Sequence, residues 1–150
     1  MRTPRLLCIL CLGIIVAACD VAPTDKFFGG GGLNLKDERG SWLLINYWAE
    51  WCAPCREEIP ELNELYAERG DLNLHIMGVN YDGIRDAALA NVIEKMGIDF
   101  PVLIDDPRRY WETELPQVLP VTLVINPEGK LIANLVGPQT KASLLAAMQQ

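Results

Sequence analysis

The order of apolar and polar residues divides the chain into an N-terminal segment and a folded region. Residues 6–18 form one apolar run, a polar and glycine-rich stretch follows, and from Trp42 onward apolar residues recur with the spacing of strands and helices. Residues 42–48 are apolar except for Asn46, which is typical of a strand buried on both faces. We therefore expect the fold to be built around this strand.

The remaining pattern alternates between strands and helices. Apolar residues on one side predict a helix over 55–69, and Gly70 is placed to end it. The pattern then predicts, in chain order, a strand over 72–80, a helix over 86–96, a short extended segment over 100–104, strands over 121–125 and 131–136, and a helix over 140–148. The alternation predicts an α/β fold with parallel pairing of the first strands. The turn sequence over 126–129 predicts an antiparallel hairpin between the last two strands.

The N-terminal segment has the features of an export signal. Arg2 and Arg5 precede the apolar run, which is shorter than the roughly 20 residues that a membrane-spanning helix requires. A signal peptide is therefore favoured over an uncleaved transmembrane helix. The run ends in Val-Ala-Ala-Cys, with Cys19 as the cysteine, and this sequence resembles a bacterial lipobox. The resemblance implies that Cys19 is lipidated and becomes the N-terminus of the mature protein.

These features predict a division into three parts. We expect a lipoprotein signal peptide over residues 1–18, a lipid-anchored flexible tether and N-terminal segment over 19–40, and a folded domain over 41–150. Glycines 29–32 fit a tether better than a phosphate-binding loop, because no Gly-Lys-Ser/Thr sequence follows them. Asp20 resembles the inner-membrane retention signal of some Gram-negative lipoproteins. The expected location is the periplasmic side of the bacterial inner membrane, with several acyl chains as the anchor.

Composition narrows the range of ligands. The chain of 150 residues is half apolar, which is enough for one hydrophobic core, and its formal charge of -7 disfavours nucleic acid as a partner. A metal site requires three or four ligands, whereas the predicted mature chain offers only Cys52, Cys55, Cys19 and His75. We therefore expect no metal. His75 lies in an apolar strand-like run and is better explained as a hydrogen-bonded structural residue.

Cys52 and Cys55 carry the chemistry that the sequence suggests. They are separated by two residues at the junction of the predicted buried strand and the following helix. A helix N-terminus provides unpaired N–H groups and the positive end of the helix dipole, both of which favour a thiolate. We expect Cys52 to be the nucleophile and Cys55, one turn further along, to resolve the mixed disulfide. A purely structural disulfide is disfavoured because so short a loop adds little stability.

Two stretches resemble the thioredoxin-fold proteins, and in particular the TlpA/ResA/DsbE branch. The first is Leu-Ile-Asn-Tyr-Trp-Ala-Glu-Trp-Cys-Ala-Pro-Cys-Arg over 44–56. The second is Leu-Pro-Val-Thr-Leu-Val-Ile-Asn over 119–126, where Pro120 matches a cis proline that faces the active-site disulfide. Residues 78–80 and 100–105 resemble the segments flanking the extra helix of this branch. The resemblance implies a thioredoxin-like fold, with a central mixed β-sheet flanked by helices and a TlpA-type helical insertion.

The resemblance also assigns roles to individual residues. Thioredoxin has a buried aspartate in the strand before its cysteines, and Asn46 stands at the matching position. Glu58 falls where ResA-like proteins carry an active-site glutamate, and an offset of three keeps it on the helix face of Cys55. The alternative for Glu58 is a solvated surface acid. The segment before Trp42 is short for the N-terminal β-hairpin that is usual in this family.

The predicted substrate contacts surround the cysteine pair. Next to the cis proline, the Leu119 backbone is expected to pair with an extended substrate segment. Trp51, Ala53 and Pro54 adjoin Cys52 and are expected to touch the substrate. Trp48 either borders the same surface or belongs to the core.

The sequence therefore predicts an extracytoplasmic, membrane-anchored thiol-disulfide oxidoreductase. It would reduce protein disulfides by dithiol–disulfide exchange and would require no soluble redox cofactor. The resemblance implies oxidised cysteine-containing proteins as substrates, apocytochrome c in cytochrome c maturation among them, and a membrane electron donor of the DsbD/CcdA type. One alternative is a thiol-based binding or chaperone module for cytochrome or copper-enzyme assembly. A peroxidase is a weaker alternative, because no Thr and Arg companions precede Cys52 at helical spacing.

Overall fold

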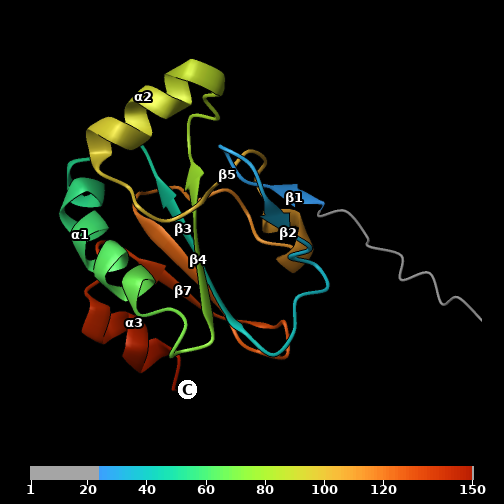
Figure 1. The fold of residues 1–150 in the computed structure, drawn as a ribbon. Coiled ribbons are helices and arrows are strands. Elements are labelled where there is room, and N and C mark those ends of the chain that lie inside the picture. The colour runs from blue at the N-terminus through green and yellow to red at the C-terminus, as the bar shows by residue number, and fades with distance from the viewer. Residues whose placement is uncertain (1–23, 150) are drawn as a thin grey trace, which may run out of the picture.

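The structure is a computed structural model that describes residues 24–149. In chain order its elements are β1 (Asp25–Lys26), β2 (Gly32–Leu33), β3 (Trp42–Trp48), α1 (Ala53–Ala67), β4 (Leu74–Asn80), α2 (Asp86–Met96), β5 (Val102–Leu103), the 3-10 helix η1 (Arg108–Trp111), β6 (Val121–Ile125), β7 (Leu131–Val136) and α3 (Lys141–Ala147). Figure 1 shows these elements as one α/β unit around a twisted sheet. The predicted signal peptide over 1–18 and the predicted lipidation site Cys19 lie outside the described residues. None of the described helices is both long enough and apolar enough to span a bilayer.

Strand β3 lies at the centre of a mixed sheet of five strands, in the order β5-β4-β3-β6-β7. It pairs in parallel with β4 and antiparallel with β6, so both of its edges are occupied. Strands β6 and β7 pair antiparallel, as the turn sequence between them predicts. Helix α2 connects β4 to β5, which confirms a helix at the predicted insertion.

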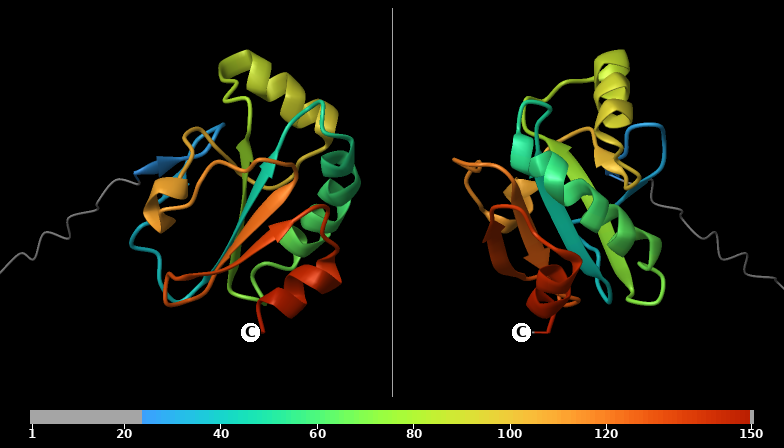
Figure 2. Two further views of the ribbon diagram at one scale, coloured as in Figure 1. Left: turned by 180° about the vertical axis from the view of Figure 1, so that it is seen from behind. Right: turned by 90° about the vertical axis from the view of Figure 1, so that its left-hand side faces the viewer.

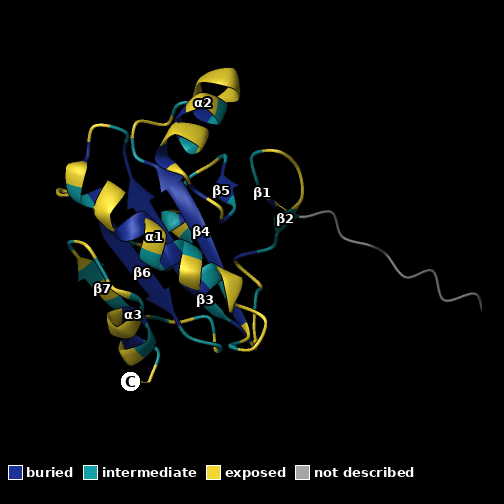
Figure 3. Cartoon of the chain, turned by 60° about the vertical axis from the view of Figure 1, so that its left-hand side comes forward, coloured by how far each residue is buried: buried dark blue, intermediate teal, exposed yellow. Residues whose placement is uncertain are grey.

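Two hydrophobic cores pack on the two faces of this sheet. Successive side chains of β3 point to opposite faces of the sheet. Leu44 and Trp48 belong to the core that also contains both cysteines. Helices α1, α2 and α3 close this first core, and Figure 2 shows α1 and α3 side by side. The second core contains Leu43, Ile45 and Tyr47 and is closed by the N-terminal segment and η1. Figure 3 shows the result, with buried central strands and helices whose outer surfaces are exposed.

Trp48 is a core residue and does not border the substrate surface. Its side chain is fully buried and packs directly over Gly78 of the neighbouring strand. A Cβ atom at position 78 would lie 2.6 Å from Trp48 Nε1. Glycine is therefore required there by the bulk of the indole ring.

The N-terminal segment is ordered where the sequence suggested a flexible tether. β1 and β2 pair antiparallel, and the Phe28 N–H donates to the carbonyl oxygen of Val102 at 2.8 Å. The Ile104 N–H likewise donates to the carbonyl oxygen of Lys26 at 3.0 Å. The hairpin thus covers the edge strand β5, which would otherwise present unpaired backbone groups.

A buried carboxylate holds this hairpin in place. Asp25 is only 5% exposed, and its carboxylate accepts hydrogen bonds from the Leu35 N–H at 3.0 Å and from the Tyr110 hydroxyl at 2.9 Å. The expectation of a flexible tether over 19–40 is therefore wrong for residues 24–35. Local sequence could not show this, because the hairpin strands are two residues each and depend on contacts with β5 and η1.

Candidate active site

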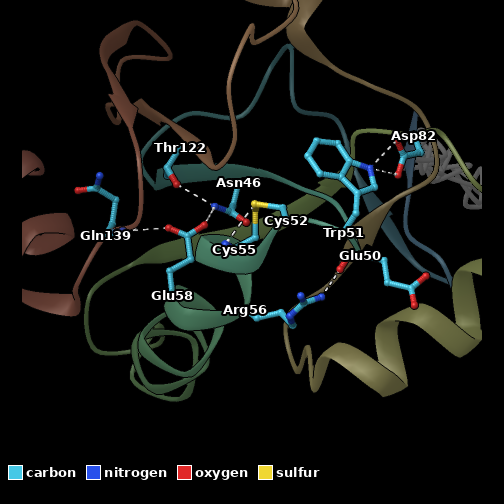
Figure 4. The surroundings of a disulfide bond; sticks show 10 residues. All are labelled: Asn46, Glu50, Trp51, Cys52, Cys55, Arg56, Glu58, Asp82, Thr122 and Gln139. Atoms are coloured by element: carbon cyan, nitrogen blue, oxygen red, sulfur yellow. Dashed lines mark hydrogen bonds between the residues drawn. A yellow bond between two sulfur atoms is a disulfide. The ribbon is translucent and has the colours of Figure 1, made fainter.

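Cys52 and Cys55 lie where β3 ends and α1 begins, and they form a disulfide (Figure 4). Cys52 is the N-cap residue of α1, and its Sγ accepts a hydrogen bond from the Cys55 N–H at 3.2 Å. Helix α1 therefore begins two residues before the predicted start, with Pro54 in its first turn. Once the disulfide opens, the same N–H group and the helix dipole are placed to stabilise a Cys52 thiolate.

The two sulfur-bearing residues differ in their access to solvent. Cys52 is 4% exposed and Cys55 is fully buried. Ala53 is exposed and Pro54 is half-buried, so the predicted substrate-contact residues adjoin the outer cysteine. This arrangement favours Cys52 as the attacking sulfur and Cys55 as the resolving one, as the sequence predicts.

Trp51 stands out from the surface beside Cys52. Its side chain is 63% exposed, yet its indole N–H donates to both carboxylate oxygens of Asp82, at 3.1 and 3.2 Å. Its ring also meets the Tyr81 ring edge-on, with centroids 6.3 Å apart. The turn after β4 therefore holds this exposed ring in one orientation. Nothing in the local sequence around Asp82 indicates this contact.

Charged residues at the rim of the site come from both helices near it. Lys95 of α2 forms an ion pair with the Glu50 carboxylate, and the Arg56 guanidinium donates to the Glu50 carbonyl oxygen. Lys95 therefore partly neutralises the charge of Glu50, which precedes the cysteines. Glu57 remains exposed on the outer side of α1.

Glu58 is buried directly behind the cysteine pair. It is 1% exposed, its Oε1 accepts from Asn46 Nδ2 at 2.6 Å, and its Oε2 accepts from the Gln139 N–H at 3.0 Å. The alternative of a solvated surface acid is therefore wrong. Burial raises the pKa of Glu58 to about 7, because loss of solvent outweighs the two hydrogen bonds that favour the carboxylate. A group that titrates near neutral pH is suited to proton exchange.

Asn46 links this carboxylate to the neighbouring strand. Its Nδ2 also donates to Thr122 Oγ1 at 3.0 Å, as the pairing of Asn46 with Thr122 in the sheet allows. Thr122 and Gln139 were not among the candidate residues. They come from β6 and from the loop before α3, 76 and 81 positions from their partners, so no local pattern could have revealed them.

The second family landmark has the predicted backbone geometry. The Leu119–Pro120 peptide bond is cis. Val121 pairs with Tyr47 at the end of β3, so Pro120 lies at the edge of the sheet from which the chain runs on to Cys52. Leu119 packs against the core that contains both cysteines.

His75 plays no part in this site. It pairs in the sheet with Leu43, near the opposite end of β3, and its Nε2 lies 3.7 Å from a carboxylate oxygen of Glu38. Across residues 24–149, no group of three or more His, Cys, Asp or Glu side chains is placed to hold a metal ion.

Comparison with known proteins identifies the family. Residues 19–134 match the AhpC/TSA family. This chain belongs to that family. Thiol-disulfide oxidoreductase ResA of Bacillus thuringiensis (strain Al Hakam) is 34% identical over 115 residues, covering 77% of this chain and 66% of the relative. ResA of Bacillus cereus (strain ZK / E33L) is 31% identical over 121 residues, covering 81% and 69% respectively. The chain thus spans about two thirds of the length of these relatives.

Solved structures confirm the thioredoxin-like fold of this family member. StoA from Bacillus subtilis superposes with a TM-score of 0.66 and 19% sequence identity, covering 82% of this chain and 92% of StoA. The central mixed sheet flanked by three helices is the fold that the sequence predicts.

The Cys52–Cys55 pair is arranged for dithiol–disulfide exchange. A Cys52 thiolate can attack a disulfide, form a mixed disulfide and release one thiolate. Attack by Cys55 on the Cys52 sulfur then releases the second thiolate and closes the Cys52–Cys55 bond. The exchange moves two electrons between the cysteine pair and the other disulfide, and the proton lost by Cys55 requires an acceptor such as the buried Glu58.

We expect the stability of the oxidised protein to depend on pH through Glu58. The pKa of Glu58 is 4.5 at its ordinary value and about 7 in the folded protein. Between these two pH values the folded protein keeps a proton that the unfolded chain has released. The contribution of Glu58 to the free energy of unfolding should therefore be largest below pH 4.5 and fall by about 1.4 kcal/mol per pH unit until pH 7. Urea unfolding across this range measures the slope.

Glu58→Gln should remove that slope, because the amide does not titrate. Glu57→Gln is the matched control, since it changes an exposed neighbour on the same helix turn and should keep the parent slope. An identical pH dependence in the parent and in Glu58→Gln would show that the buried carboxylate does not titrate in this range.

Proposed function

We propose that this protein reduces disulfide bonds of extracytoplasmic proteins by dithiol–disulfide exchange. The observation that carries the proposal is the placement of Cys52 as the N-cap of α1, with Cys55 and Glu58 buried behind it. The outer sulfur can reach a substrate, the inner sulfur can resolve the intermediate, and the buried carboxylate can accept the proton. The names of the relatives, which are thiol-disulfide oxidoreductases, support the same chemistry.

The substrate binds as an extended segment beside the cis proline. The Leu119 backbone offers strand-like pairing, which provides affinity with little dependence on the substrate sequence. The exposed Trp51 ring, held by Asp82, forms one wall next to Cys52. Such a surface suits oxidised cysteine-containing proteins, including apocytochrome c during cytochrome c maturation.

The direction of electron flow is towards the substrate. A protein that strongly stabilises its dithiol form becomes an oxidant. Ala53 and Pro54, between the cysteines, carry no charge that would hold a thiolate, and the buried Glu58 disfavours a second anion beside it. The disulfide form is thus relatively favoured, and the reduced protein is a good electron donor.

The protein acts at the outer face of the inner membrane, anchored by lipid on Cys19. Because the ordered hairpin begins near Thr24, the link from Cys19 to the described domain can span at most about 18 Å at roughly 3.6 Å per residue. The domain therefore stays close to the bilayer. This closeness suits electron transfer from a membrane donor of the DsbD/CcdA type.

Trapping of mixed disulfides tests the roles of the two cysteines. Cys55→Ser should accumulate a stable mixed disulfide with substrate, because the attacking sulfur is retained and the resolving sulfur is lost. Cys52→Ser, the matched control, should trap nothing and lose all reductase activity. Non-reducing electrophoresis followed by mass spectrometry detects the mixed disulfides of both variants. Equal trapping by the two variants would contradict the roles assigned to Cys52 and Cys55.

The reduction potential tests the direction. We expect a value nearer to that of thioredoxin, about -270 mV, than to that of DsbA, about -120 mV. Equilibrating the purified protein against a series of dithiothreitol or glutathione ratios measures it. A potential above about -180 mV, the value of protein disulfide isomerase, would indicate that the protein is an oxidase or isomerase and not a reductant.

The lipid anchor is tested at the mature N-terminus. Mass spectrometry of protein isolated from membranes should find an N-terminal Cys19 carrying a diacylglyceryl thioether. Cys19→Ser should leave the protein unlipidated and release it from the membrane fraction. An unmodified Cys19 in membrane-bound protein would contradict this mode of anchoring.

A further inference from the structure

Asn46 carries a buried polar atom that the oxidised structure leaves unsatisfied. The residue is fully buried, and its Nδ2 makes two hydrogen bonds, to Glu58 and to Thr122. Its Oδ1 has no hydrogen-bond partner among residues 24–149. A buried acceptor without a donor is unfavourable, and most such groups in folded proteins are hydrogen-bonded.

The Asn46 side chain points to the face of the sheet on which the cysteines lie. It has the same parity along β3 as Leu44 and Trp48, which belong to the core that contains Cys52 and Cys55. Figure 4 shows the Asn46 amide between Glu58 and the disulfide. Glu58, whose Oε1 lies 2.6 Å from Asn46 Nδ2, follows Cys55 by three residues on the same helix face.

Reduction of the disulfide creates a donor that the oxidised protein lacks. Uptake of two electrons and two protons converts the Cys52–Cys55 bond into two thiols, and the buried Cys55 thiol then carries an S–H group. The unpaired Oδ1 of Asn46, on the same face of the sheet as Cys55, is a candidate acceptor for this S–H. The acceptor that is unsatisfied in the disulfide form would thus be satisfied in the dithiol form.

We propose that Asn46 is a positioning residue of the dithiol form, with Oδ1 accepting a hydrogen bond from the Cys55 thiol while Nδ2 holds the Glu58 carboxylate. This inference rests on the proposed dithiol–disulfide exchange. One amide thereby orders the proton donor and the proton acceptor of the resolving step. It also keeps Cys55 protonated, so that Cys52 alone is the thiolate that attacks substrate.

The step that Asn46 prepares is balanced in protons and electrons. As the Cys55 sulfur attacks the mixed disulfide at Cys52, its proton passes to Glu58 and the substrate leaves as a thiolate. In the network formed by the cysteine pair, Asn46 and Glu58, the groups that titrate are the two cysteines and Glu58, all at the N-terminal part of α1. β3, β6 and the loop before α3 contribute Asn46, Thr122 and the Gln139 backbone, none of which titrates.

The test is the titration of Cys55 in the reduced full-length chain, followed by the Cβ chemical shift of 13C-labelled cysteine. Asn46→Leu removes the acceptor, so the acidity constant of the Cys55 thiol should rise about three- to tenfold. Asn46→Asp has the same shape with a negative charge, and it should shift the titration of Cys55 in the opposite direction. A residue with only a structural role would not produce opposite shifts.

Two control experiments distinguish a direct contact between Asn46 and Cys55 from an indirect effect. Thr122→Val removes the other hydrogen bond of Asn46 Nδ2 and should leave the titration of Cys55 unchanged. The effect of Asn46→Leu should persist in a Glu58→Gln background, because the contact is direct. An unchanged Cys55 titration in both Asn46 variants, or an effect that disappears without Glu58, would overturn the inference. None of these outcomes depends on the reduction potential or on substrate trapping, which test the proposed function separately.

Discussion

The contact between β3 and the first turns of α1 determines the rest of the site. The hydrogen bond from Asn46 to Glu58 joins the centre of the sheet to the helix, and buried side chains of α1 such as Ile59 and Leu62 pack the helix onto the sheet. With the helix in this position, its N-terminus meets the end of β3. Cys52 is then the N-cap and Cys55 lies inside the core. The chemistry of the pair thus follows from where the helix begins.

This arrangement places a carboxylate where a protein core normally avoids one. A buried charge is costly unless it is hydrogen-bonded, and Glu58 meets that condition through Asn46 and the Gln139 backbone. The two hydrogen bonds do not cancel the loss of solvent, so the pKa stays near 7. Polar groups that are incompletely satisfied in a core are typical of functional sites, where stability is given up for reactivity. Asn46, whose Oδ1 has no hydrogen-bond partner within residues 24–149, fits that description.

The N-terminal hairpin changes how the domain relates to its surroundings. It covers β5 and is joined to η1 by the buried Asp25 carboxylate, so residues 24–35 belong to the folded unit. The lipid anchor proposed at Cys19 would then hold the domain by a short link, which allows less freedom than a long tether. The same hairpin closes the second core, on the face of the sheet opposite the cysteines. One short element therefore both covers β5 and closes the second core.

The sequence by itself determined the features that depend on neighbouring residues. Apolar periodicity located β3, α2, β6 and β7, and the spacing of Cys52 and Cys55 at a strand–helix junction identified the chemistry. Resemblance to a family placed Glu58 and Pro120. Only the tertiary structure decided that Glu58 is buried, that Thr122 and Gln139 surround it through Asn46, and that Asp82 holds Trp51. The physical reason is that solvation and hydrogen bonding of these groups depend on segments that only folding brings together, whereas periodicity records the short-range preferences of the chain.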